Sequence, residues 1–217
     1  MFQQMLNGSR AVLLRPSVST FEEYERNDLG WALIYIAIAA VATAILNAVR
    51  FAIGGPAMQE AMRSMQDQFG GQPLPPGFGA MMGGGSLTGA IVGGLFGSII
   101  GFLIWTGIIF LLGRAFGGSG AFGELAYDVA LFSAPMAVIN ALVGVISIGP
   151  LACLTFIVTV ALALYNLYLS WLSIQSGMNL PPNKALIVIL LPFLAGLLLC
   201  CGLAALLVPW FTVSEVR

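Results

Sequence analysis

The sequence contains no histidine and few charged residues. Asp, Glu, Lys and Arg make up 8% of its 217 residues, whereas an average soluble domain has about 25%. The absence of histidine removes the commonest metal ligand and general base, and with it every Ser-His or Cys-His nucleophile. A net charge of −1 supplies no basic patch for nucleic acid. We therefore expect no nucleic-acid partner and none of the familiar hydrolase mechanisms.

Cysteine is also scarce. The three cysteines, Cys153, Cys200 and Cys201, all lie within apolar runs. Two of them are adjacent, which is unlike the spacing of a disulfide framework. We expect all three to act as small hydrophobic residues.

Apolar residues dominate the chain: 59% are hydrophobic, and the mean hydropathy is +0.98. Five apolar runs are long enough to cross a bilayer core of about 30 Å, which needs about 20 helical residues. The predicted spans are 30–53, 87–112, 125–148, 151–174 and 185–209. The sequence therefore predicts an all-α integral membrane protein with five transmembrane helices.

The lysines and arginines of the short loops predict the orientation of these spans. If the spans alternate in direction, the basic residues fall into two sets, one on each side of the membrane. The larger set is Arg10, Arg15, Arg26, Arg114 and Lys184, and the smaller set is Arg50, Arg63 and Arg217. We assign the larger set to the cytoplasm, which predicts a cytoplasmic N-terminus and an outer C-terminus.

Residues 1–28 are predicted to be a cytoplasmic amphipathic segment ahead of a membrane domain over 29–217. The segment lacks the apolar core and cleavage site of a signal peptide, so we expect it to stay on the protein. Thr20 and Glu23 have the spacing of a capping box, which predicts a helix that begins there and runs toward the first span. The apolar residues upstream are expected to lie along the membrane interface; they are Phe2, Met5, Leu6, Val12, Leu13 and Leu14.

The segment 54–86 is predicted to be an outer loop rich in Gly, Pro, Gln and Met. Within it Pro56 favours the start of a short helix. The apolar residues on one face of that helix are Met58, Ala61, Met62, Met65 and Phe69. We interpret the helix as amphipathic and lying on the outer leaflet. An alternative is a Cu(I) site formed by the thioethers of Met58, Met62 and Met65, although flexible Met more often fills an apolar face.

Glycine recurs at every fourth position at the start of the second span. The row consists of Gly85, Gly89, Gly93, Gly97 and Gly101. Small residues four apart let two helix backbones approach closely in lipid. Each step of four turns by about 400°, so the row drifts by roughly 40° per step around the helix. We expect the row to pack the second span inside its own bundle, with dimerisation as the less favoured use.

Four polar residues stand out in or beside the spans: Arg114, Glu124, Asp128 and Asn140. Glu124 and Asp128 are one helical turn apart, so they share a face at the cytoplasmic mouth of the third span. The pair is either an entry point for protons or cations, or a solvated pair close to Arg114, and the second interpretation is the simpler. Asn140 lies deep in the span and is expected to have an interhelical partner.

Short motifs are spread over nearly the whole chain. They are Arg15-Pro16 followed by Phe21, Gly117-Gly118-Ser119-Gly120-Ala121-Phe122 leading to Ala134-Pro135, Tyr165-Asn166-Leu167-Tyr168, and Asn183-Lys184-Ala185. In this order on five spans, the pattern resembles the prokaryotic branch of the Yip domain family, five-helix membrane proteins whose eukaryotic members interact with Ypt/Rab GTPases. The resemblance implies no enzymatic activity and action through other membrane proteins. Eukaryotic members carry an Asp-Leu-Tyr-Gly-Pro stretch where this chain has Asp28-Leu29-Gly30, which argues against a Rab-like GTPase partner.

These features favour a non-enzymatic scaffold, or an assembly or trafficking partner, in a prokaryotic plasma membrane. Its expected partners are the lipid bilayer and other integral membrane proteins, or a second copy of the chain. The alternative is a small ion or lipid transporter or channel, although five helices without an internal repeat are unlike the inverted-repeat transporters. An intramembrane enzyme is less favoured, because the sequence has no metal-ligand cluster, nucleophile pair or phosphate-binding loop. No cofactor is expected.

Overall fold

The described part of the chain is helical throughout. The computed structural model describes the backbone of residues 2–68, 87–147 and 152–213, and their side chains except at 55–59, 61–63, 65–68, 87–92, 152–153, 197 and 199–213. The helices are α1 (Phe2–Leu14), α2 (Val18–Tyr24), α3 (Leu29–Gln68), α5 (Leu87–Ala115), α6 (Phe122–Ile146), α7 (Ala152–Met178) and α8 (Pro182–Val213). This arrangement confirms the predicted all-α class.

Four of these helices contain a segment long and apolar enough to cross a membrane. The segments are Leu29–Gly54, Gly93–Ala115, Phe122–Ile146 and Leu154–Met178. The chain is therefore an integral membrane protein, and the first four predicted spans agree with these segments. In α8 the described apolar stretch, Pro182–Gly196, is shorter. The fifth span at 185–209 stays a prediction.

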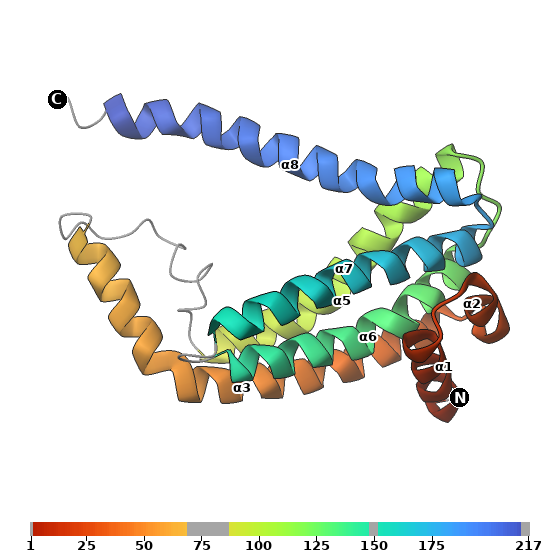
Figure 1. Ribbon diagram of the computed structural model, residues 1–217, viewed down its shortest axis with the longest axis horizontal. Helices are drawn as coiled ribbons and strands as arrows, with labels where there is room; N and C mark the ends of the chain where they lie inside the picture. Colours follow the sequence, from red (N-terminus) through yellow and green to blue (C-terminus); the bar gives the residue numbers. More distant parts are fainter. Residues whose placement is uncertain (1, 69–86, 148–151, 214–217) are drawn as a thin grey trace.

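Helices α3, α5, α6 and α7 pack together as a bundle, and α8 diverges from it after its first turns (Figure 1). The main seam lies between α3 and α6, where small buried side chains face inward from both helices. They are Ala32, Ala39 and Ala40 on α3 and Ala126, Ala130 and Ala134 on α6. Small residues let helix backbones approach closely, so van der Waals contacts accumulate. Alanine, and not the glycine row, lines the most extensive seam of the bundle.

The glycine row of α5 does not form the core of the bundle. A Cβ atom built on Gly93, Gly97 or Gly101 would have no neighbouring atom within 4 Å, and all three glycines are exposed. The expectation that the row packs the second span inside its own bundle is therefore wrong for Gly93 and Gly97, whereas Gly101 lines a cavity between the bundle helices without contacting them there. Gly85 and the surroundings of Gly89 lie outside the described residues.

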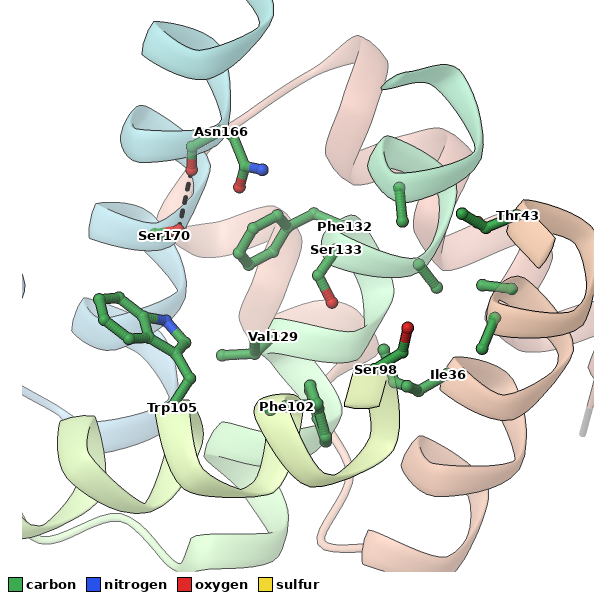
Figure 2. A pocket seen from close by; sticks show the side chains of 15 residues that line it. Ile36, Thr43, Ser98, Phe102, Trp105, Val129, Phe132, Ser133, Asn166 and Ser170 are labelled. Atoms are coloured by element: carbon green, nitrogen blue, oxygen red, sulfur yellow. Dashed lines mark hydrogen bonds between the residues drawn. The ribbon is translucent and has the colours of Figure 1, made fainter. Parts of the chain in front are cut away.

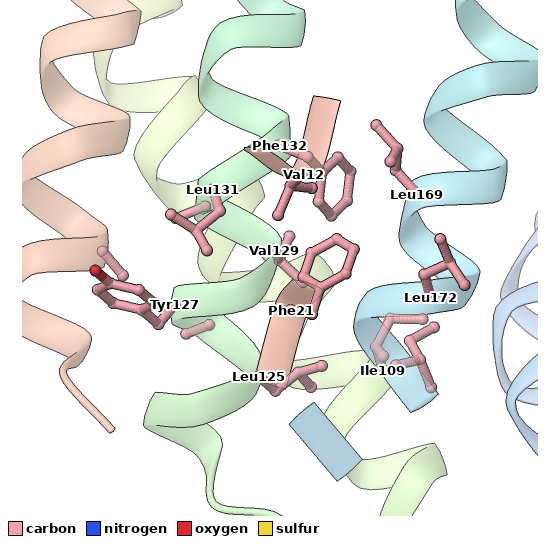
Figure 3. Packing of buried hydrophobic residues seen from close by; sticks show 14 of the residues in the cluster. Val12, Phe21, Ile109, Leu125, Tyr127, Val129, Leu131, Phe132, Leu169 and Leu172 are labelled. Atoms are coloured by element: carbon pink, nitrogen blue, oxygen red, sulfur yellow. The ribbon is translucent and has the colours of Figure 1, made fainter. Parts of the chain in front are cut away.

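The N-terminal helices pack onto one end of the bundle (Figure 1). On α1, Met5 and Val12 are buried, so the expectation that they lie along the membrane interface is wrong. On α2, Phe21 is completely buried and its ring packs edge-on against Phe132 of α6, with 6.3 Å between the ring centroids. Figure 3 shows Val12, Phe21 and Phe132 in one cluster with Leu169 of α7. The N-terminal helices α1 and α2 and the membrane domain thus share one hydrophobic core.

The helix starts in this region differ from the predicted ones. Ser17 caps α2, because its Oγ accepts a hydrogen bond from the Thr20 amide at 3.1 Å. The capping box predicted at Thr20 and Glu23 is therefore wrong. Asp28 caps α3 separately by accepting from the Trp31 amide at 3.1 Å, so α2 does not run into the first span.

The segment predicted as an outer loop is partly helical. Helix α3 continues from Leu29 through Gly54, Gly55 and Pro56 to Gln68, so the amphipathic helix expected after Pro56 is a continuation of the first span. The methionine side chains proposed as a copper site, and residues 69–86, lie outside the described residues.

Candidate functional site

The four polar residues singled out in the sequence do not form one cluster. Arg114 lies exposed in the last turn of α5, where a positive charge interacts favourably with the helix dipole. Its guanidinium carbon is 5.3 Å from the centroid of the Phe110 ring. Among the described residues, no ion pair joins Arg114 to Glu124 or Asp128. The interpretation of a solvated pair beside Arg114 is wrong because Asp128 is fully buried.

Glu124 and Asn140 have unrelated surroundings. The Oε2 atom of Glu124 accepts a hydrogen bond from the Ala121 amide at 2.8 Å, so this carboxylate caps the start of its own helix. Asn140 is half-buried. Within the described ranges it has no hydrogen-bond partner, so the interhelical bond expected for it is not formed there.

Asp128 is the one of the four that is fully buried, with 0% of its surface exposed. In the part of the chain that the structure describes, neither carboxylate oxygen has a hydrogen-bond partner. The Ser176 hydroxyl of α7 is a polar neighbour of the carboxyl, but it too lacks a partner with hydrogen-bond geometry. A carboxyl without donors in a protein interior is costly and calls for an explanation.

Gly177 brings α7 close to this carboxyl. A Cβ atom on Gly177 would lie 2.8 Å from the Leu125 Cα atom and 3.3 Å from the Asp128 Oδ2 atom. A side chain would therefore push α7 away from α6. Because Gly177 has none, the two backbones meet directly beside Asp128.

The link between α2 and α3 lies over the start of α6. The Oε1 atom of Glu25 is buried there, and no described residue gives it a hydrogen-bond partner. Burial raises the pKa of Glu25 above its ordinary value, and the negative charges of Glu124 and Glu22 add to the effect. Asn27 occupies the space beside Gly123, which has no side chain to exclude it. Acidic groups therefore converge on the end of the α6–α7 seam.

A glycine-rich loop joins α5 to α6 at the same end of the bundle. Gly117, with a φ of 91°, and Gly118 close α5 by hydrogen bonds to the carbonyls of Arg114 and Gly113, which is a Schellman motif. The Ser119 amide then donates to the Met178 carbonyl at 3.0 Å. The glycines of this motif thus let the loop lie directly against the end of α7.

A cavity of about 310 Å³ lies deeper in the bundle, between α3, α5, α6 and α7 (Figure 2). Five of its lining residues are polar, and none is charged: Thr43, Ser98, Ser133, Asn166 and Ser170. The Ser98 and Ser170 hydroxyls donate to carbonyls of their own helices. The Asn166 side chain projects into the cavity from α7 (Figure 2). The cavity therefore offers polar contacts but no acid or base.

Sequence reasoning missed several residues of this region. Tyr165 donates a 2.6 Å hydrogen bond to the Leu13 carbonyl and so fastens α1. Glu25, Ser176 and Gly177 surround Asp128. Ser176 and Gly177 lie in the last turn of α7, 48 or more positions after Asp128 in the sequence, so no local pattern links them to it. One local pattern could have located the link. Asp28 stands directly before an apolar run, and aspartate is a preferred helix cap, so this position predicts that a new helix begins there and that the preceding helix ends before it.

The fold and these surroundings define a helical integral membrane protein whose N-terminal helices are built into the end of its bundle. The sequence model of the Yip1 domain matches residues 10–204. The chain belongs to the Yip1 domain family, and the match confirms the resemblance seen in its motifs. No curated protein and no solved structure matches the chain significantly.

Proposed function

We propose that this Yip1-domain protein is a non-enzymatic scaffold, or an assembly or trafficking partner, for other integral membrane proteins. It resides in a prokaryotic plasma membrane with five spans, a cytoplasmic N-terminus and an outer C-terminus. The observation that carries the proposal is the free glycine face of α5, formed by Gly93 and Gly97. No other part of the described chain occupies the space beside these glycines.

A small-residue face allows a partner helix to approach closely in lipid, where apolar side chains alone give little preference over lipid tails. Because the row drifts around α5, it fits a helix that crosses at about −40° better than one that runs parallel. The partner is the transmembrane helix of another protein or α5 of a second copy. The exposed side chains of α1, Phe2, Leu6 and Leu14, provide a further apolar surface for docking at the end of the bundle.

The proposal that the protein is not an enzyme rests on the sequence. A chain without histidine and with 8% charged residues offers few groups for general acid–base or nucleophilic chemistry. Its partners are other proteins of the same membrane and do not include a Rab-like GTPase.

Photocrosslinking in native membranes tests the scaffold function. A photoreactive phenylalanine analogue replaces Phe96, which is 61% exposed and adjacent to Gly97. The matched control replaces Phe156 of α7, which is 69% exposed. We expect protein crosslinks from position 96 but not from 156, identified by mass spectrometry. If position 96 captures no reproducible protein, a second copy included, the scaffold function is wrong.

Two substitutions separate docking from folding. Gly93→Leu and Gly97→Leu place bulky side chains in open space. We expect both variants to keep the thermal stability of the wild-type monomer and to lose the crosslinks from position 96. A loss of monomer stability would mean that the glycines pack within the bundle after all.

A small ion or lipid transporter or channel is the second candidate function. It is supported by the buried carboxyl of Asp128, because intramembrane acidic residues often mark ion or proton pathways. Purified protein in liposomes should then conduct an ion or move a labelled lipid, and Asp128→Asn should reduce the flux. Flux equal to that of empty liposomes would count against this function.

A further inference from the structure

Asp128 lies where three parts of the fold meet. It is on α6, it faces Ser176 and Gly177 of α7, and the link after α2 lies nearby with Glu25. Helix α2 also packs on α7. A change in the size or hydration of the Asp128 side chain therefore affects the packing of both α7 and the N-terminal helices.

The charged form of Asp128 does not fit these surroundings. A carboxylate only accepts hydrogen bonds and has about four lone-pair sites to satisfy. Within the described ranges, neither of its oxygens receives a donor, and the Ser176 hydroxyl is also without a partner. Burying an unpaired charge costs much more than burying a neutral polar group.

The charges that act on Asp128 are all of the same sign as a carboxylate. They are Glu22 of α2, Glu25 of the α2–α3 link and Glu124 of α6. Tyr127 of α6 is a further titratable neighbour, and it in turn interacts with Arg26 and Asp28. The α7 side offers Ser176 and Gly177, which carry no charge. These like charges disfavour a further negative charge in the seam.

A proton is the cation that this site can hold with the groups present. The described residues include no group of three His, Cys, Asp or Glu side chains that would ligate a metal ion. A proton needs only one carboxyl oxygen and converts the residue into a neutral group with a hydroxyl donor.

We propose that Asp128 is a proton-binding site and that its proton holds α2 and α7 against α6. When the O–H bond of the carboxyl breaks, the proton leaves to water and both electrons stay on the carboxylate oxygen. The carboxylate then needs hydrogen-bond donors, which it obtains when α2 lifts and water enters the seam. The surface formed by α1 and α2 is thereby coupled to pH. This inference does not depend on the scaffold function.

Infrared spectroscopy of the full chain in lipid nanodiscs tests the proton directly. We expect the C=O stretching band of a protonated carboxyl at neutral pH in the wild type, its loss in Asp128→Asn, and its retention in Glu25→Gln. The Glu25 variant is included because that carboxyl is also partly buried. A wild-type protein without the band at neutral pH overturns the proposal even if Asp128→Asn fails to fold. A band that persists in Asp128→Asn also overturns it.

Hydrogen exchange tests the coupling to α2. Protection factors, which already correct for intrinsic exchange, are measured for the amides of Val18–Tyr24 across a pH series. We expect protection to fall roughly tenfold per pH unit over the pH range in which Asp128 is protonated in the closed state and ionised in the open state, because one proton is then released on opening. Asp128→Asn should remove this dependence, and Glu23→Gln, at an exposed position on α2, should retain it. Protection that responds to sodium instead of pH, or that is the same in wild type and Asp128→Asn, would overturn the coupling.

Discussion

Ser9 of α1 and Tyr35 of α3 share a buried hydrogen bond of 2.8 Å between their hydroxyl groups. The two residues are 26 positions apart in the sequence. Together with the bond from the Tyr165 hydroxyl to the Leu13 carbonyl, it ties α1 to two different helices of the bundle. The N-terminal helix is therefore attached through polar contacts as well as through the apolar side chains of Met5 and Val12.

Tyr35→Phe is expected to weaken the attachment of α1. It leaves the Ser9 hydroxyl buried without a partner, which costs about 1–3 kcal/mol of unfolding free energy. The double variant Ser9→Ala/Tyr35→Phe should lose less unfolding free energy than the sum of the two single variants, because it leaves no buried hydroxyl group without a partner. Denaturation in detergent measures the cycle, and proteolysis near α1 measures its release. Tyr168→Phe, at an exposed position, is the control. A coupling energy of zero would contradict the role of the bond.

Gly177→Ala is expected to destabilise the contact between α6 and α7. The new Cβ atom would lie 2.8 Å from the Leu125 Cα atom, and a backbone atom cannot move aside alone. Overpacking of this kind costs about 1–3 kcal/mol. The matched control is Gly107→Ala in α5, where no neighbour lies within 4 Å. That change should be neutral or stabilise the helix by up to about 1 kcal/mol. Equal unfolding free energies for the two variants would contradict the close approach of α7.

Glu25→Gln is expected to change how stability depends on pH. Burial raises the pKa of Glu25 in the folded protein above its ordinary value of 4.5, so the folded state binds its proton more tightly than the unfolded state does. This contribution to stability is full below pH 4.5 and is lost as pH rises through the raised pKa. The Gln variant lacks this loss, so it should become more stable than the wild type as pH rises through that window.

Thermal unfolding of the Glu25 variant over a pH series measures the difference. Glu23→Gln, exposed on α2, controls for the removal of one negative charge. If wild type and Glu25→Gln keep a constant difference in stability across the series, Glu25 is not buried against the start of α6.

The sequence was sufficient to predict the four described segments that are long and apolar enough to cross a membrane. The predicted span 125–148 overlaps the segment Phe122–Ile146, and 30–53 overlaps Leu29–Gly54. The reason is physical: a bilayer requires a run of about 20 apolar residues, and such a run is visible without any knowledge of packing. The family was also predictable, because its motifs include glycines with a local backbone role, such as Gly117 with its positive φ.

The sequence did not predict which helices pack against each face of a given helix. The spacing of the α5 glycines predicted that they pack inside the bundle, yet alanines of α3 and α6 line the main seam and Gly97 faces open space. In lipid, a small residue permits close approach but does not select a neighbour. Which helices meet depends on the whole set of side chains on all of them.

Asp128 shows the same division between local sequence and tertiary structure. Its spacing from Glu124 placed both carboxyls at the mouth of one helix, where a solvated pair was the simpler interpretation. The tertiary structure instead buries Asp128 completely, because Gly177 lets α7 come close and the link after α2 covers the seam. The sequence by itself determined the membrane class, four candidate spans and the family. Only the tertiary structure decided which carboxyl is buried away from solvent, because burial depends on residues that are distant in the chain.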